Sequence, residues 1–158
     1  MSVSIVAHGP HATRALGGRI TTGILQSTRA AAVPLLVTLS GDLGAGKTTF
    51  VGGLLEAFGN SGPARSPTYT LIEPYRLAGR DLYHCDLYRL RHPDELEDLG
   101  LRDLRRPGSV LLVEWPEQAA GRLGAPDVTV EFLYEGDTAR RVTFAFGTDV
   151  GAEVLAQL

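Results

Sequence analysis

The residues of this sequence with the clearest chemical potential are the glycines, the lysine and the threonines between positions 41 and 49. They fit the pattern G-x4-G-K-[ST] in full, from Gly41 to Thr48. Glycines allow successive backbone N–H groups to curl around a phosphate, because no Cβ stands in the way. Lys47, the only lysine of the chain, can bridge β- and γ-phosphates, and the Thr48 hydroxyl can bind Mg²⁺. We therefore predict that nucleotide phosphates are bound by Gly41, Asp42, Leu43, Gly44, Ala45, Gly46, Lys47, Thr48 and Thr49.

This segment has the surroundings that a phosphate-binding loop needs. Residues 35–40 form a short apolar run, typical of a strand buried on both faces. After the loop, apolar residues recur with helical spacing up to Phe58, and Gly59 follows at a position suited to a helix C-terminus. A helix that begins near Lys47 directs the positive end of its dipole towards the same anion.

The base of the nucleotide is indicated by what the sequence lacks. P-loop GTPases read guanine through an N-K-x-D segment. The only asparagine is Asn60 and the only lysine is Lys47, so this chain cannot contain that segment. ATP is therefore the favoured nucleotide.

Hydrolysis requires a carboxylate at the end of a neighbouring strand, where it holds Mg²⁺ or orders the attacking water. Glu114 directly follows the apolar run 109–113, so it should emerge at the carboxyl edge of the sheet, where α/β proteins bind ligands. The alternative is an ordinary surface glutamate at a strand end. Asp86 lies between apolar residues and is either a second carboxylate near the metal or the partner of Arg89 in a structural ion pair.

Three further residues have two interpretations each. Thr68 lies in the loop after the first βα unit and either senses the γ-phosphate or makes ordinary turn contacts. Trp115, the only tryptophan, either packs in the core or lies beside the nucleotide. His84 is interpreted as structural, because phosphoryl transfer needs little acid–base chemistry from the protein.

The periodicity of the chain predicts the elements that would position these residues. We expect a first helix over 12–25, strands at 70–75 and 82–87, a short helix at 93–100 and a hairpin formed by 128–134 and 141–146. The fold class expected from apolar strands next to helices is an α/β P-loop NTPase-like sandwich. It has a central, mostly parallel sheet, helices on both faces and antiparallel additions, in one domain spanning 1–158.

Composition restricts the function further. The 158 residues have a net charge of -3, which argues against a protein that binds nucleic acid by itself. Arg102, Arg105 and Arg106 form either a local basic patch or a solvated helix face. Cys85, the only cysteine, indicates a reducing compartment and is interpreted as a small buried apolar residue. With no signal peptide and no run long enough to span a membrane, a cytoplasmic location is expected.

Four segments in fixed order make the chain resemble the bacterial TsaE family, the small ATPases of tRNA threonylcarbamoyladenosine biosynthesis. The resemblance covers about residues 12–146, and the matching segments are 41–50, 66–75, 83–90 and Glu114-Trp115-Pro116. The family resemblance implies binding of ATP and Mg²⁺, slow hydrolysis by the isolated protein, and action with the proteins TsaB and TsaD. Those two transfer a threonylcarbamoyl group to adenosine 37 of tRNA, so contact with tRNA would be indirect. Hydrolysis would reset their complex between turnovers.

The resemblance also implies roles for individual residues. Lys47, Thr68, Asp86 and Glu114 would be catalytic, with Thr48, Asp86 and Glu114 at the metal. Trp115 would lie near the nucleotide, and the start of the first helix near His11 and the hairpin near Arg140 would border the adenine.

The sequence departs from the family pattern in two places that bear on these residue roles. An aromatic residue usually stands at the position of Cys85, which predicts local repacking that leaves Asp86 in place. The segment before Ala12 lacks the acidic residues common there, which weakens the case for an adenine contact from it.

Two other functions fit the phosphate-binding loop. A small metabolite kinase would need an acceptor pocket and an arginine-bearing lid, and the arginines here are scattered. A non-enzymatic scaffold would bind ATP and hydrolyse it only incidentally.

Overall fold

Four parallel strands form the centre of the sheet. They are β2 (Leu35–Gly41), β4 (Arg80–Asp86), β5 (Val110–Glu114) and β6 (Val128–Glu135). The antiparallel additions are β1 (Ser2–His8) and β7 (Ala139–Phe146) at one edge and β3 (Ile72–Leu77) at the other. This computed structural model describes residues 1–67 and 70–158, with the strand order β1-β7-β6-β2-β5-β4-β3. β2, which leads into the phosphate-binding loop, therefore lies between β5 and β6.

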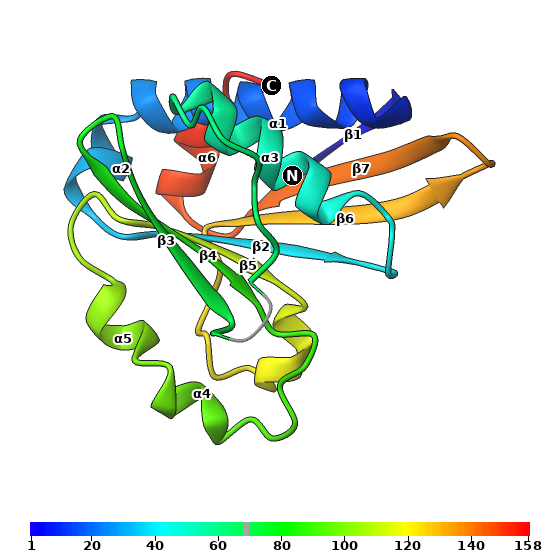
Figure 1. Ribbon diagram of the computed structural model, residues 1–158. Coiled ribbons are helices and arrows are strands. Elements are labelled where there is room, and N and C mark those ends of the chain that lie inside the picture. The colour runs from blue at the N-terminus through cyan, green and yellow to red at the C-terminus, as the bar shows by residue number, and fades with distance from the viewer. Residues whose placement is uncertain (68–69) are drawn as a thin grey trace.

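Helices cover both faces of the sheet (Figure 1). On one face lie α1 (Gly9–Gln26), α3 (Lys47–Ala57) and α6 (Asp149–Leu155), with α2 (Thr28–Ala32) following α1. On the other lie α4 (Glu95–Asp98), α5 (Leu101–Leu104) and the 3-10 helix η1 (Pro116–Ala119). Each face has its own apolar cluster, one with Phe50, Phe132 and Phe144 and one with Leu36 and Leu111. The predicted α/β sandwich with antiparallel additions is confirmed.

Some of the predicted strand and helix boundaries differ from the observed ones. β3 and β4 are each displaced by about two residues from 70–75 and 82–87, because Ala78 and Gly79 form the turn between them. The short helix expected over 93–100 is observed as α4, which begins two residues later than Pro93, and Gly100 at φ 66° lies past its end as predicted and precedes α5. β1 and α6 were not expected at all. Among the described helices, none has both the length and the apolar composition needed to cross a membrane.

Close packing between α1 and α3 fixes the start of α3 and with it the phosphate-binding loop. A Cβ at Gly17 would lie 2.2 Å from the carbonyl oxygen of Phe50, and one at Gly53 would lie 2.0 Å from that of Arg14. Only glycine permits this approach of two helix backbones. The Thr21 hydroxyl adds a buried hydrogen bond of 2.8 Å to the carbonyl of Leu54.

A buried carboxylate joins the beginnings of β2 and β6 to α6. Asp127, 8% exposed, accepts a hydrogen bond of 2.7 Å from the Leu36 amide and one of 2.6 Å from the Thr148 hydroxyl. The Thr148 hydroxyl also accepts from the amide of Gly151 and so caps α6. Asp127 is therefore a junction between the sheet and the C-terminal helix.

We predict that Asp127→Ala lowers the free energy of unfolding by about 2–4 kcal/mol, because it leaves a buried amide and a hydroxyl unpaired. Urea denaturation monitored by circular dichroism would measure the loss. Asp137→Ala, at an exposed position in the β6–β7 turn, is the matched control and should have little effect. Equal stability of the two variants would contradict the role assigned to Asp127.

Candidate functional site

The phosphate-binding loop connects β2 to α3 through backbone conformations that favour glycine. Gly41, Gly44 and Gly46 have φ of 141°, 76° and 109°. A Cβ at Gly41 would also lie 2.6 Å from the carbonyl oxygen of Phe132 on β6. Both the conformation and the space therefore require glycine at the point where β2 turns into the loop.

The ammonium group of Lys47 lies inside this loop. Lys47 is 4% exposed, and its Nζ donates to the carbonyl of Gly41 and, at 2.9 Å, to that of Asp42. The same Nζ is 4.2 Å from the centroid of the Trp115 ring. Burial lowers the pKa of Lys47, although the nearby Glu114 carboxylate acts in the opposite direction. An anion beside this ammonium would compensate for its burial.

Glu114 is buried beneath the loop at the end of β5, with 2% of its surface exposed. Its Oε1 accepts hydrogen bonds from Thr48 Oγ1 at 3.0 Å and lies 2.8 Å from His84 Nε2. The observed burial excludes the alternative of an ordinary surface glutamate. A hydroxyl from α3 and a carboxylate from β5 thus meet at the carboxyl edge of the sheet.

Asp86 lies beside Glu114, because β4 and β5 pair in parallel with Asp86 opposite Glu114. Its carboxylate accepts from the Tyr88 amide at 3.0 Å and from the Ser66 hydroxyl at 3.4 Å. Burial raises the pKa of Asp86, and the Glu114 carboxylate adds to the rise. No ion pair with Arg89 is found among the described residues, so the structure favours the interpretation in which Asp86 faces the site.

The oxygen atoms gathered here suit a magnesium ion. Mg²⁺ binds one or two protein oxygens and completes its coordination with water and phosphate. Thr48 and Glu114 provide a hydroxyl and a carboxylate that are already 3.0 Å apart. The described residues contain no group of three or more His, Cys, Asp or Glu side chains that could hold a metal ion by themselves.

Two hollows open on either side of the loop and share Gly44, Gly46 and Thr49. The larger, about 200 Å³, is lined by the loop together with Lys47, Thr48, Ser66, Asp86, Tyr88, Glu114 and Trp115. The smaller, about 110 Å³, is lined by Gly9, Pro10, Thr13, Thr138 and Arg140. The first collects most of the predicted phosphate and metal residues, and the second lies where a nucleoside could continue from the phosphates.

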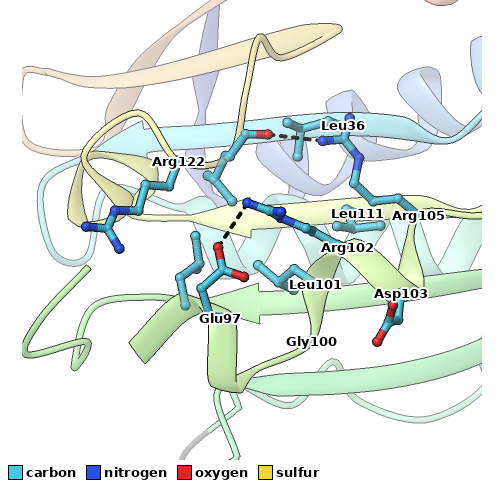
Figure 2. Close-up of a pocket in the computed structure, with 11 residues that line it drawn as sticks. Leu36, Glu97, Gly100, Leu101, Arg102, Asp103, Arg105, Leu111 and Arg122 are labelled. Atoms are coloured by element: carbon cyan, nitrogen blue, oxygen red, sulfur yellow. Dashed lines mark hydrogen bonds and ion pairs between the residues drawn. The ribbon is translucent and has the colours of Figure 1, made fainter. Parts of the chain in front are cut away.

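A third hollow, on the opposite face of the sheet, does not belong to this site. About 170 Å³ in volume, it has leucines at its floor and arginines from α5 and the chain after η1 at its rim (Figure 2). Its arginines have local partners: Arg102 contacts Glu97 at 3.0 Å, and Arg105 contacts the Leu123 carbonyl at 3.1 Å. The arginines of α5 therefore form a locally paired helix surface rather than an anion site.

Comparison with known proteins shows the family. A model of the family "Threonylcarbamoyl adenosine biosynthesis protein TsaE" matches residues 7–142. The "tRNA threonylcarbamoyladenosine biosynthesis protein TsaE" of Haemophilus influenzae is 44% identical over 122 residues, which cover 77% of each chain. The protein of that name from Bacillus subtilis is 41% identical over 125 residues, 78% of each chain. The crystal structure of Bacillus subtilis YdiB superposes with a TM-score of 0.75 at 27% identity, over 99% of this chain and 93% of the other.

The chain belongs to the TsaE family. The resemblance on which the sequence prediction of this family rested is thereby confirmed. The assignments of individual site residues remain predictions, for which the structure supplies positions and contacts.

Arg140 and His11, the two residues expected to border the adenine in this TsaE family member, lie in different hollows. Arg140 lines the smaller hollow, and its guanidinium lies 4.2 Å from the centroid of the Tyr134 ring. His11 is exposed and lines a separate surface hollow with Arg14 and Glu56. The helix begins at Gly9, and Gly9 and Pro10 line the smaller hollow together with Arg140. The adenine contact expected near His11 stays a prediction.

Trp115 and Thr68 complete the set of predicted residues. Trp115 has the left-handed backbone conformation, with φ 57°, and its amide donates to the Leu39 carbonyl at 3.2 Å. Its ring contacts Tyr88, 4.9 Å between centroids, and lines the larger hollow beside Lys47. Thr68 lies outside the described residues. Cys85 is buried on the opposite face of β4, where burial raises the pKa of its thiol to about 12.

Ser66, His84 and Tyr88 contact the site carboxylates, although none of them was predicted from the sequence to do so. His84 could have been found from strand periodicity, because residues 84 and 86 of one strand point to the same face of the sheet. Ser66 and Tyr88 lie in loops, for which periodicity gives no orientation.

The pKa of Asp86 leads to a prediction about stability. Because burial raises this pKa above that of the unfolded chain, ionisation of the carboxyl opposes folding. The destabilisation by ionised Asp86 has its full size above the pKa of the folded state. It disappears as the pH falls below the pKa of the same carboxyl in the unfolded chain. Asp86→Asn should therefore raise the melting temperature at pH 7 without nucleotide, and the gain should vanish near about pH 3.

Asp81→Asn is the matched control, since Asp81 lies on the same strand in an exposed ion pair of 2.7 Å with Arg76. It should give no gain. A lower melting temperature for Asp86→Asn than for wild type at pH 7 would contradict the account of Asp86.

Proposed function

We propose that this chain is a magnesium-dependent ATPase that serves tRNA threonylcarbamoyladenosine biosynthesis at position 37. The observation that carries the proposal is the buried Glu114 carboxylate, held 3.0 Å from the Thr48 hydroxyl beneath a lysine-containing phosphate loop. Family membership supports the pathway, and the loop and its carboxylate support the reaction.

The loop and α3 would hold the phosphates. Backbone amides of the glycine turn would contact phosphate oxygens near the N-terminus of α3, where the helix dipole favours negative charge. Lys47, whose Nζ already lies among the loop carbonyls, would exchange these contacts for phosphate oxygens and neutralise part of their charge.

Glu114 and Asp86 would act at the terminal phosphate. Glu114 is fixed at the strand end, so its carboxylate can order a water for attack without first losing side-chain freedom. Asp86, opposite Glu114 in the register, would support the same water as a second carboxylate. Thr48 and Glu114 would hold Mg²⁺, which when bound offsets phosphate charge, with Asp86 beside it.

The sequence and the family support a proposal for the nucleotide and the partners. The absence of an N-K-x-D segment favours ATP over GTP. We propose that TsaB and TsaD are the protein partners and that hydrolysis permits their repeated turnover. The net charge of -3 favours contact with tRNA through those partners rather than directly.

Phosphate release from ATP tests this proposal, measured for the chain alone and with purified TsaB and TsaD. We predict slow release by the chain alone and stimulation by the partners. Glu114→Ala should reduce the rate by roughly 100-fold or more while ATP is still bound, because it removes the carboxylate and leaves the loop intact.

Glu117→Ala is the control, since this exposed carboxylate lies three positions further along the chain. It should leave the rate unchanged. Normal turnover by Glu114→Ala would exclude the role of Glu114. Transfer of the γ-phosphate to a metabolite would establish a kinase instead, and intact pathway function in cells carrying Glu114→Ala would establish a scaffold.

A further inference from the structure

The buried histidine on β4 makes a contact that packing does not explain. His84 is fully buried, and its Nε2 lies 2.8 Å from Glu114 Oε1. Its other ring nitrogen, Nδ1, has no hydrogen-bond partner among the described residues. An imidazole in this place therefore satisfies one nitrogen and leaves the other unpaired.

The two nitrogens together indicate where the proton lies. A carboxylate oxygen can only accept, so Nε2 must carry hydrogen for the 2.8 Å contact to be a hydrogen bond. In the neutral ring Nδ1 is then an acceptor without a donor, which is costly in a buried site. A phenylalanine or leucine would fill the same space without this cost, so the donor from Nε2 is what the imidazole contributes.

The contact distinguishes the two oxygens of Glu114. Oε1 accepts from Thr48 Oγ1 at 3.0 Å and from His84 Nε2, whereas the contact of Oε2 with a described residue is the 3.4 Å one with Thr48. The two donors come from different elements, α3 and β4, and hold Oε1 from two directions. Oε2 remains available for a water or a cation.

We propose that His84 is a positioning residue for the hydrolysis of ATP, a role that rests on the proposed function. By donating from Nε2 to Glu114 Oε1, His84 fixes the rotation of the carboxylate and directs Oε2 towards the bound phosphates. Without the donor, the carboxylate can turn and Oε2 loses its fixed place.

The test compares substitutions that keep or remove the donor. His84→Gln places an amide N–H near the position of Nε2 and should keep the rate of phosphate release within about threefold of wild type. His84→Phe fills the space without a donor and should lower kcat by roughly 10- to 100-fold, with little change in KM for ATP. His84→Asn, whose amide is too short to reach Oε1, should resemble His84→Phe and serves if the phenylalanine variant fails to fold.

Cys85→Ala is the matched control for packing, because Cys85 is buried next to His84 and faces the other cluster. It should lower stability and leave kcat unchanged. In a Glu114→Ala background, His84→Asn should cause no further loss, because the two residues act through one contact. An additive loss, or equal rates for His84→Gln and His84→Asn, would overturn the proposal.

The position of the proton on the His84 ring can be measured independently of hydrolysis. Long-range ¹H–¹⁵N correlation spectra of the histidine rings report it, and the His84 signals are assigned by their loss in His84→Asn. A proton on Nε2 supports the contact, and a neutral ring with its proton on Nδ1 overturns it. If wild type releases no phosphate, the proposed function fails and the spectrum still decides the His84–Glu114 contact.

Discussion

The burial of one carboxylate organises this site. Glu114 is 2% exposed, and a carboxyl group with so little access to solvent needs hydrogen-bond partners within the protein. The donors come from two elements that are distant in sequence: Thr48 lies in the first turn of α3, and His84 lies on β4. Both reach Glu114 only because β5 lies between β2 and β4 in a parallel sheet whose carboxyl ends meet at one edge.

The charged groups at this edge of the sheet oppose folding. Burial lowers the pKa of Lys47 and raises that of Asp86, so both ionised forms are disfavoured where they stand. The rest of the molecule compensates through apolar clusters on both faces of the sheet and through junctions such as Asp127. A site that opposes folding by itself is expected where charged groups await charged ligands.

Much of this arrangement was predictable from the sequence, and the reasons are local. A buried strand, a glycine turn and an amphipathic helix follow one another directly in residues 35–58, so their geometry depends on few distant contacts. The position of Glu114 at a strand end was predictable for the same reason. The edge strand β1 alternates only weakly, with Ser2, Ser4 and Val3 all exposed, and it depends on pairing with β7 at the other end of the chain.

The contact between His84 and Glu114 was not predictable, because it depends on which strands are neighbours and on their register. The residues are 30 positions apart in sequence. They come into contact because the register places Asp86 directly opposite Glu114, and His84 lies two residues before Asp86 on the same face of β4. The start of the first helix was not predicted either. The apolar periodicity indicated a start at residue 12, whereas α1 begins at Gly9, so Gly9 and Pro10 line the smaller hollow and His11 lines another.

The proposal that the glycine loop binds the phosphates of ATP, with Trp115 beside them, can be tested most directly by fluorescence. Trp115 is the only tryptophan, and its ring lies 4.2 Å from Lys47 Nζ, so its emission reports on this site alone. Titration with magnesium and ATP should change the emission with saturation, and Lys47→Ala should shift that change to much higher ATP concentration. ATP binding detected by calorimetry without any change in Trp115 emission, or with unchanged affinity in Lys47→Ala, would contradict the account.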